Sequence, residues 1–287
     1  MSAAGGERGT LWVVATPIGN LSDLSPRAAE VLARVSAVAA EDTRRTRKLY
    51  AHIGAAPPAM LSLPAFDERA RLGSVLDRLA AGEEVALCTD AGTPGVSDPG
   101  AALVRAAWQA GARVVPVPGP SAALAALAGS GLPADRFTFA GFLPRKGGAR
   151  AGALAWLAAQ PCTLVLYEAG NRTRETLRDL AEALGDRPAV VARELTKLHE
   201  ELARGTLSEL GERFGGEVLG EVTLVVSGPG EGIAARPAPE EARPLDEELR
   251  ERVGRGEAPS AIAREVARAR GLRRADIYAR LERLRKG

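Results

Sequence analysis

Short apolar stretches that predict β-strands alternate with helical patterns along most of this chain. Strand-like stretches such as TLWVVAT (10–16) and EVALCT (84–89) are apolar on both faces, which is typical of strands covered by helices on both sides. Helix signals follow them: in SPRAAEVLARV, Ser25 can cap a helix that has Pro26 at its first position. Strand–helix–strand repeats of this kind predict an α/β fold with mainly parallel sheets.

The strand pattern runs through two cycles and then stops at a linker. We predict strands at 10–16, 36–42, 84–89, 113–117, 136–142, 162–168, 189–194 and 221–228. The stretch GEGIAARPAPEEARP (230–244) is rich in Pro and Glu and predicts a linker. We therefore divide the chain into an α/β lobe at 1–120, a second α/β lobe at 121–229, the linker at 230–244 and a helical module at 245–287.

The helical module is strongly basic. Between Arg264 and Lys286 nine basic and three acidic residues give a net charge of +6, so that the rest of a chain of net charge +2 carries −4. Ser260 is placed to cap a first helix, and Ala267, Gly271 and Ile277 have the spacing of a helix-turn-helix. We expect this module to bind a polyanion such as RNA through Arg273, Arg274 and Arg280. A solvated, arginine-rich helical hairpin is the alternative.

Several classes of protein are disfavoured by what the chain lacks. It has no run of about 18 apolar residues, and its opening MSAAGGERG has no apolar segment typical of a signal peptide. Cys88 and Cys162 lie in apolar stretches and are expected to be reduced thiols, which favours the cytoplasm. His52 and His199 have no partner at metal-ligand spacing, so that we predict no metal site.

Four loops that follow predicted strands are rich in Gly, Pro and small polar residues: TPIGN (16–20), TDAGTPGVSDPG (89–100), PGPSA (118–122) and YEAGNR (167–172). In parallel sheets such loops meet at one edge, where ligands bind. Neither GxxxxGK[ST] nor a strand-linked GxGxxG occurs, which disfavours nucleoside triphosphates and dinucleotides. A ligand without phosphate, such as S-adenosylmethionine, fits these loops, although any one of them alone would be explained as a tight turn.

Seven motifs in order carry a resemblance to a known family: TPIGNLSD, AEDTRRT, DAGTPGVSDPG, VPGPSA, GFLPRK, YEAGNR and ARELTK. The chain resembles the tetrapyrrole-methylase-like superfamily, and within it the ribosomal branch, the small-subunit methyltransferase I family of 16S ribosomal RNA cytidine 2′-O-methyltransferases. The resemblance implies two α/β lobes of the tetrapyrrole methylase type with a C-terminal helix-turn-helix-like module, S-adenosylmethionine in the cleft and a homodimer. It further implies 16S ribosomal RNA in the small subunit as substrate, with cytidine 1402 of the decoding centre as target.

The resemblance also implies which residues hold the cofactor: Ile18, Gly19, Asp90, Gly92, Thr93, Val96, Ser121, Ala122, Tyr167 and Glu168. Small-molecule members of the superfamily carry an acid at the position of Thr93, whereas here Asp90 lies three residues earlier, and its role stays open. The ribosomal branch has a histidine and an asparagine before Glu68, where this chain has Phe66 and Asp67.

A ribose 2′-hydroxyl is a weak acid, so that its methylation requires a base or a cation that stabilises the developing charge. The motif AEDTRRT supplies Glu41, Asp42 and Arg44, and RELTK supplies Glu194 and Lys197. We predict that one of the three acids is, or orients, the base, while Arg44 and Lys197 act on the hydroxyl or on phosphate; Arg45 is a further RNA contact. Asp98 is a weaker candidate, because the following Pro99 favours a helix N-cap there.

Two other functions stay open on the sequence. One is methylation of a corrin or porphyrin precursor, against which the basic module speaks. The other is RNA binding without catalysis, which predicts no affinity for S-adenosylmethionine. A dinucleotide-dependent oxidoreductase is excluded by the missing glycine fingerprint.

Overall fold

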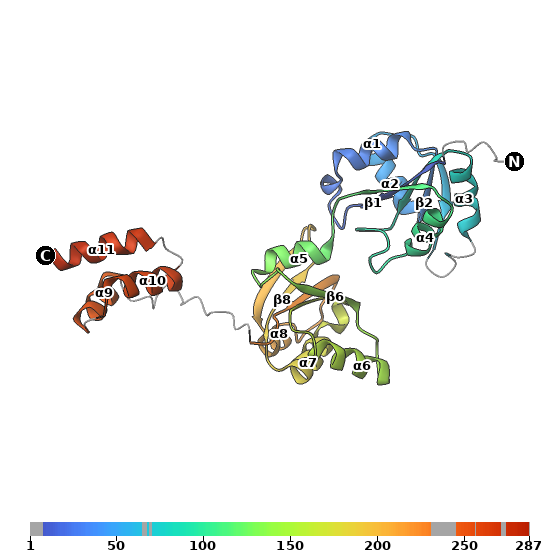
Figure 1. Ribbon diagram of the computed structural model, residues 1–287. Helices are drawn as coiled ribbons and strands as arrows, with labels where there is room; N and C mark the ends of the chain where they lie inside the picture. Colours follow the sequence, from blue (N-terminus) through green and yellow to red (C-terminus); the bar gives the residue numbers. More distant parts are fainter. Residues whose placement is uncertain are drawn as a thin grey trace. The chain divides into compact units, whose positions relative to one another are not determined.

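A computed structural model describes residues 8–64, 68, 71–230, 245–255, 257–270 and 274–286. The chain separates into two compact units, Met1–Gly232 and Ile233–Gly287, and each is described by itself. The larger unit contains two α/β lobes, and the smaller one consists of helices (Figure 1).

The first lobe is built on a sheet whose five described strands are all parallel, in the order β3-β2-β4-β1-β5. These strands are β1 (Thr10–Val14), β2 (Ala37–Ala40), β3 (Ala59–Ser62), β4 (Glu84–Cys88) and β5 (Arg113–Val117). The short β3, which the sequence pattern did not indicate, lies at one edge.

Helices cover both faces of this sheet: α1 (Pro26–Arg34), α2 (Thr43–Ile53), α3 (Leu72–Ala80) and α4 (Ala101–Gln109). Ser25 caps α1, as predicted, by accepting a hydrogen bond from the backbone N–H of Ala28. Because side chains alternate along a strand, Trp12 and Val14 pack with the α1 and α2 side, whereas Leu11 packs with the α3 and α4 side. Burial on both faces explains why these strands are continuously apolar.

The second lobe departs from the prediction of a mainly parallel sheet. Its strands are β6 (Phe137–Phe142), β7 (Thr163–Ala169), β8 (Pro188–Arg193), β9 (Glu201–Thr206) and β10 (Glu221–Val226), in the order β6-β7-β10-β8-β9. Only β6 and β7 pair in parallel, while β10 runs antiparallel to both of its neighbours and β9 is antiparallel to β8. The chain turns back from β8 into β9 without a crossover helix, and this direct connection makes the two strands antiparallel.

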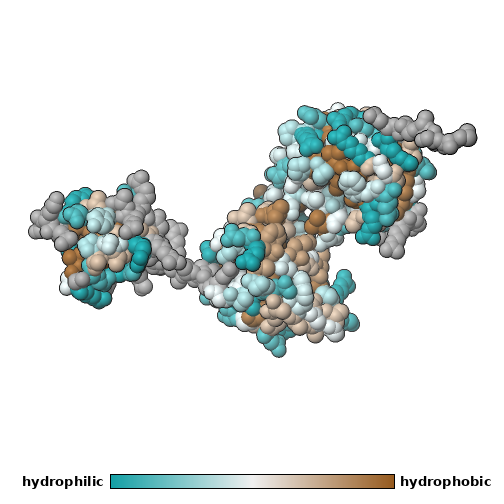
Figure 2. Space-filling view, viewed as in Figure 1, coloured by the Kyte–Doolittle hydropathy of each residue, from teal (hydrophilic) through white to brown (hydrophobic). Residues whose placement is uncertain are grey.

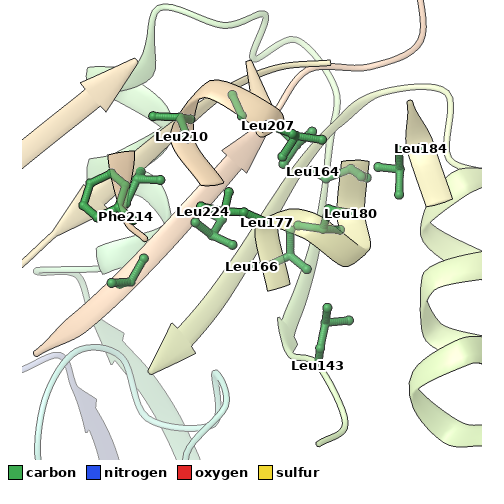
Figure 3. Packing of buried hydrophobic residues seen from close by; sticks show 14 of the residues in the cluster. Leu143, Leu164, Leu166, Leu177, Leu180, Leu184, Leu207, Leu210, Phe214 and Leu224 are labelled. Carbon is green, nitrogen blue, oxygen red and sulfur yellow. The ribbon is translucent and has the colours of Figure 1, made fainter. Parts of the chain in front are cut away.

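One face of the second sheet is covered by α6 (Gly147–Ala158), α7 (Thr173–Leu184) and α8 (Leu207–Arg213). Leucines from α7, α8 and the strands form its core (Figure 3). A fourth helix, α5 (Ala122–Ser130), also contacts strands of this sheet. Hydrophobic surface is visible over α5 (Figure 2), where Leu124 is 56% exposed.

The smaller unit contains α9 (Leu245–Gly254), α10 (Pro259–Arg270) and α11 (Arg274–Lys286). Its core includes Leu249 of α9, Ile262 and Ala267 of α10, and Ile277 of α11. Burial of Ala267 and Ile277 agrees with the predicted pattern. Ser260, in contrast, is the second residue of α10 and not its cap. Gly271 and Arg273 lie outside the described residues.

Candidate active site

A cavity of about 350 Å³ lies in the larger unit, lined by residues of both lobes. From the first lobe it receives the loops that follow β1, β4 and β5. From the second it receives the carboxyl ends of β6, β7 and β8 together with the beginning of β10. The antiparallel direction of β10 brings Gly220 and the first residues of the strand, Glu221–Thr223, to the same sheet edge as the ends of β7 and β8. The edge predicted from the four loops is therefore where the cavity lies.

Most of the residues predicted to hold a cofactor line this cavity: Ile18, Gly92, Thr93, Val96, Ser121, Ala122, Tyr167 and Glu168. Gly19 and Asp90 lie beside it and are not part of its lining. The predicted catalytic set does not line it either: Glu41, Asp42, Arg44, Glu194 and Lys197.

The glycine-rich loop after β4 is tied to the loop after β1. The backbone groups of Thr16 and Gly92 exchange two hydrogen bonds, of 2.9 and 3.0 Å. Gly92 has φ +81°, a left-handed conformation that side chains disfavour. The hydroxyl of Thr93 donates to the carbonyl of Pro120 in the loop after β5 (3.4 Å). These contacts hold three strand-end loops together as one wall.

Asp98 occupies this wall and does not cap α4, contrary to the interpretation that the sequence favoured. The helix begins at Ala101 after Gly100. Its first N–H groups are satisfied by Glu68, one carboxylate oxygen of which accepts from Gly100 (3.0 Å), Ala102 (3.1 Å) and Leu103 (3.2 Å). Asp98 thus has no capping task and lines the cavity.

The pKa of Asp98 is raised to about 6, first by burial and then by the negative charges of Glu41, Asp90 and Glu221. A half-buried carboxylate among other carboxylates is costly to ionise, so that it accepts a proton more readily than an ordinary aspartate does. Such a group is suited to act as a general base near neutral pH.

Glu41 and Asp42 lie at the end of β2, next to Asp90. The N–H of Asp90 donates to Glu41 (3.3 Å), and the N–H of Asp42 donates to Asp90 (3.0 Å). Burial raises the pKa of Glu41, which the backbone N–H of Asp90 partly offsets. Asp90 also pairs with Arg45, with 3.3 Å between Nε and Oδ2.

Asp42 has a structural task at the start of α2. Its carboxylate accepts from the backbone N–H of Arg44 (2.8 Å) and pairs with the guanidinium of the same residue (2.7 Å). These hydrogen bonds hold the pKa of Asp42 at about 2, which makes it a poor base.

Glu194 and Lys197 form a tight turn after β8. Lys197 Nζ lies 2.8 Å from a carboxylate oxygen of Glu194 and 2.8 Å from one of Glu221. Glu194 and Thr196 both have positive φ, 49° and 67°, which is uncommon for residues other than glycine. A Cβ on Gly19 would lie 2.5 Å from Lys197 Cγ, so that this turn packs closely against the loop after β1.

Tyr167 and Glu168 occupy the opposite wall. The hydroxyl of Tyr167 accepts from the N–H of Ala123 (3.3 Å). Glu168 is 2% exposed and accepts from the hydroxyl of Thr176 (2.6 Å) and the N–H of Ala169 (2.9 Å). Glu168 is therefore held firmly in place by its own neighbours.

The structure describes the side chains of only some of the residues predicted to bind RNA. Arg45 is paired with Asp90 as described, and Arg280 of α11 pairs with Asp246 of α9 (2.6 Å). Arg273 lies outside the described residues, as do Phe66 and Asp67, and the side chain of Arg274 is likewise not described.

Sequence reasoning did not predict several residues that line the cavity, among them Phe142 and Glu221, and it favoured a capping role for Asp98. Phe142 stands at the start of the motif FLPRK, which was recognised only as part of a resemblance. Glu221 begins a strand whose antiparallel direction was not predicted. Among the described residues no group of acidic, His or Cys side chains is arranged to hold a metal ion, and none of the described helices has the length and hydrophobicity to span a membrane.

Residues 10–211 match the family described as Tetrapyrrole (Corrin/Porphyrin) Methylases. A protein of Xylella fastidiosa named ribosomal RNA small subunit methyltransferase I is 48% identical over 94% of this chain and 98% of its own length. Proteins with the same name from Micromonospora olivasterospora and a Synechocystis species are 45% and 44% identical over 94% of the chain, covering 85% and 96% of their own lengths.

Solved structures share the fold at low sequence identity. A uroporphyrin III C-methyltransferase from Thermus thermophilus, complexed with S-adenosylhomocysteine, aligns with a TM-score of 0.56 at 22% identity, over 76% of this chain and 97% of its own. A diphthine synthase aligns with a TM-score of 0.60 at 17% identity, over 76% and 90% of the two chains.

Proposed function

Because the chain belongs to the tetrapyrrole (corrin/porphyrin) methylase family, we propose that it methylates the ribose 2′-hydroxyl of a cytidine in 16S ribosomal RNA. It is an S-adenosylmethionine-dependent methyltransferase, and its relatives named for the small ribosomal subunit support ribosomal RNA as its substrate. By resemblance to the ribosomal branch, the target is cytidine 1402.

The lining of the cavity carries this proposal. Among the described residues that form it, none is Lys or Arg, whereas Asp98, Glu168 and Glu221 contribute carboxylates. Carboxylates in the lining disfavour a phosphate-bearing ligand by charge repulsion and favour a cationic ligand without phosphate. S-adenosylmethionine has this chemistry, and the cavity has a volume within the usual range of ligand sites.

The cofactor would be held by the residues of the cavity walls: Ile18, Gly92, Thr93, Val96, Ser121, Ala122, Tyr167 and Glu168. When bound, S-adenosylmethionine supplies a methyl group activated by a positively charged sulfur. Gly19 and Asp90 would support these loops from behind, Gly19 by its close packing on the turn at Lys197 and Asp90 by its hydrogen bonds at the end of β2.

Asp98 is the base of this proposal. Its carboxylate would take the proton of the ribose 2′-hydroxyl, and bound S-adenosylmethionine would supply the methyl group to that oxygen. Glu41 assists by raising the pKa of Asp98. Glu194 and Lys197 position Glu221 at the cavity, and Asp42 with Arg44 fixes the start of α2.

Several further assignments follow from the same resemblance. The basic module, with Arg273, Arg274 and Arg280, and Arg45 in the first lobe would bind ribosomal RNA phosphates. The exposed apolar helix α5 is consistent with a homodimer. If its substrate is the small ribosomal subunit, as proposed, the enzyme would act in the cytoplasm.

The proposal is tested with the full-length protein and S-adenosylmethionine labelled in its methyl group. We expect label to enter isolated small ribosomal subunits, on a cytidine ribose, and not a porphyrin precursor offered in parallel. Nuclease digestion and chromatography of the nucleosides identify the product. Label on a base, or on the porphyrin precursor alone, would exclude the assignment, and calorimetry that detects no cofactor binding would leave only RNA binding without catalysis.

A further inference from the structure

The segment Phe142–Lys146, called here the FLPRK loop, leads from the end of β6 to α6 beside the cavity. The pairing of β6 with β7 shifts by one residue between Phe139 and Gly141, where Gly141 has φ +62°. Phe139 pairs with Val165 and Phe142 with Tyr167, so that the bulge places both phenylalanines on the face of Tyr167. Bulges re-aim side chains in this way next to active sites.

Phe142 is an aromatic ring at the mouth of the cavity. Its ring centroid lies 5.6 Å from that of Tyr167, which in turn lies 4.9 Å from Phe139. Phe142 lines the cavity and is nevertheless 56% exposed, whereas Tyr167 is half-buried. A large apolar ring left in water at the edge of a site is suited to stacking against a planar ligand.

The backbone of the FLPRK loop is held in place by a buried side chain and by hydrogen bonds to its carbonyl groups. Leu143 is buried, with 4% exposure. The carbonyl of Pro144 accepts from Arg150 Nη1 (3.0 Å), and the carbonyl of Leu143 accepts from Arg172 Nη2 (3.3 Å). Arg150 is itself buried and paired with Asp179 (2.7 Å). A buried arginine that donates a hydrogen bond to a loop carbonyl fixes the position of the loop and of the loop's side chains.

Two cations follow on the exposed side of the same loop. Arg145 and Lys146 are exposed, and neither forms an ion pair with a residue that the structure describes. The cofactor has no phosphate that these side chains would bind. Phosphates of a nucleic acid that enters the cavity, however, would pass on this exposed side.

We propose that the FLPRK loop receives the target nucleotide, with Phe142 stacked on its base and Arg145 and Lys146 bound to the flanking phosphates. The inference rests on the proposed function and deepens it. Sequence-specific RNA recognition targets mostly single-stranded segments, whose unstacked bases stack on aromatic side chains. Phe142 supplies such a side chain beside the carboxylate of Asp98, which lines the same cavity.

The test compares full-length variants for methyl transfer to small ribosomal subunits and for cofactor binding by calorimetry. Phe142→Ala is expected to lower kcat/KM for the subunit roughly 5- to 150-fold, the range for loss of one base–aromatic stack, with the Kd for S-adenosylmethionine changed less than twofold. Phe142→Tyr should restore most of the rate. Trp156→Ala, which removes another exposed aromatic ring (51%) from α6, is the matched control and should leave kcat/KM unchanged.

The double variant Arg145→Ala/Lys146→Ala should weaken subunit binding and make it less dependent on salt, with the slope of log K against log salt reduced by about 1 to 2. Equal losses of cofactor affinity and rate in Phe142→Ala would assign the ring to the cofactor and overturn the inference. Unchanged kcat/KM in both variants would overturn it as well. Wild-type protein measured alongside separates the two proposals, because a wild type that does not label the subunit contradicts the proposed function itself.

Discussion

Replacement of Asp98 by asparagine tests the proposed base directly. The change keeps the size of the side chain and removes its ability to take a proton, so that we expect kcat/KM to fall about 10²- to 10⁴-fold, the usual contribution of a general base. With a pKa of about 6, the carboxylate is about 90% ionised at pH 7 and about 10% at pH 5. Wild-type kcat/KM should therefore fall close to tenfold from pH 7 to pH 5. This decrease at low pH, called here the acid limb, should be absent from the pH profile of Asp98→Asn.

The raised pKa of Asp98 also changes how the stability of the folded protein depends on pH. The pKa of Asp98 is higher in the folded protein than the ordinary value of 3.8, so that the folded state binds the proton more tightly. Stability that this group contributes is then lost as the pH rises from about 4 to 6. A shift of this size corresponds to at most about 3 kcal/mol, and because half of the side chain stays accessible to water we expect about 1 kcal/mol. Asp98→Asn should be more stable than wild type by about that amount at pH 7.

The assay is single-turnover methyl transfer to small ribosomal subunits from pH 5 to 9, together with urea unfolding at pH 5 and pH 7. Asp90→Asn is the matched control, since it removes a carboxylate of the same loop that does not line the cavity. It should keep the acid limb, displaced to lower pH because Asp90 also raises the pKa of Asp98. An Asp98→Asn variant that methylates within a fewfold of wild type and keeps the limb would refute the assignment of Asp98 as base.

Three further predictions concern the neighbours of this site. Glu41→Gln removes a negative charge that raises the pKa at the proposed base, and the acid limb of kcat/KM should move to lower pH; an unmoved limb would contradict the coupling. Gly19→Ala places a Cβ 2.5 Å from a side-chain carbon of the adjoining lysine and should weaken cofactor binding measured by calorimetry, whereas Gly73→Ala, with open space around it, should not. Glu68→Ala leaves three N–H groups at the start of α4 without their acceptor and should lower the free energy of unfolding by about 1 to 2 kcal/mol, as measured in urea.

The first lobe could be predicted from the sequence because its strands are buried on both faces. Burial on both sides leaves β1, β2 and β4 nearly continuous in apolar residues, and such stretches stand out from the helices between them. The edge strand β3 escaped because its four residues, AMLS, are only partly buried or exposed. A strand with one neighbour carries little of the signal that the central strands carry.

The order of the second sheet could not be predicted, for a related reason. In β9, the sequence ELARGT buries only Ala203 fully and has no apolar alternation. Without β9, the pattern after β8 predicts a crossover connection and therefore a mainly parallel sheet. The pairing of β10 between β7 and β8 depends on contacts far apart in the chain, which local patterns do not report.

The sequence predicts which loops form the candidate site, but it does not predict what each residue of those loops does. The glycine-rich loops gave most of the cavity lining, because parallel strands end at one edge. The N-cap interpretation of Asp98 was wrong, although an Asp-Pro pair is a common helix start. The cap of α4 is instead Glu68, 32 residues before Gly100, and no local pattern shows that contact. Phe142 was missed because a bulge reverses the face on which an alternating strand would place it.

The position of β10 also sets an order for the synthesis of this protein. β10 is the last strand of its sheet to leave the ribosome, yet it lies in the middle, between β7 and β8. Until residue 226 has emerged, those two strands each lack a neighbour, and the cavity lacks the wall formed by Gly220–Thr223. A growing chain therefore cannot form the whole cavity before the second lobe is complete. Assembly of this lobe waits on a pairing between distant segments, which is a slow step in folding.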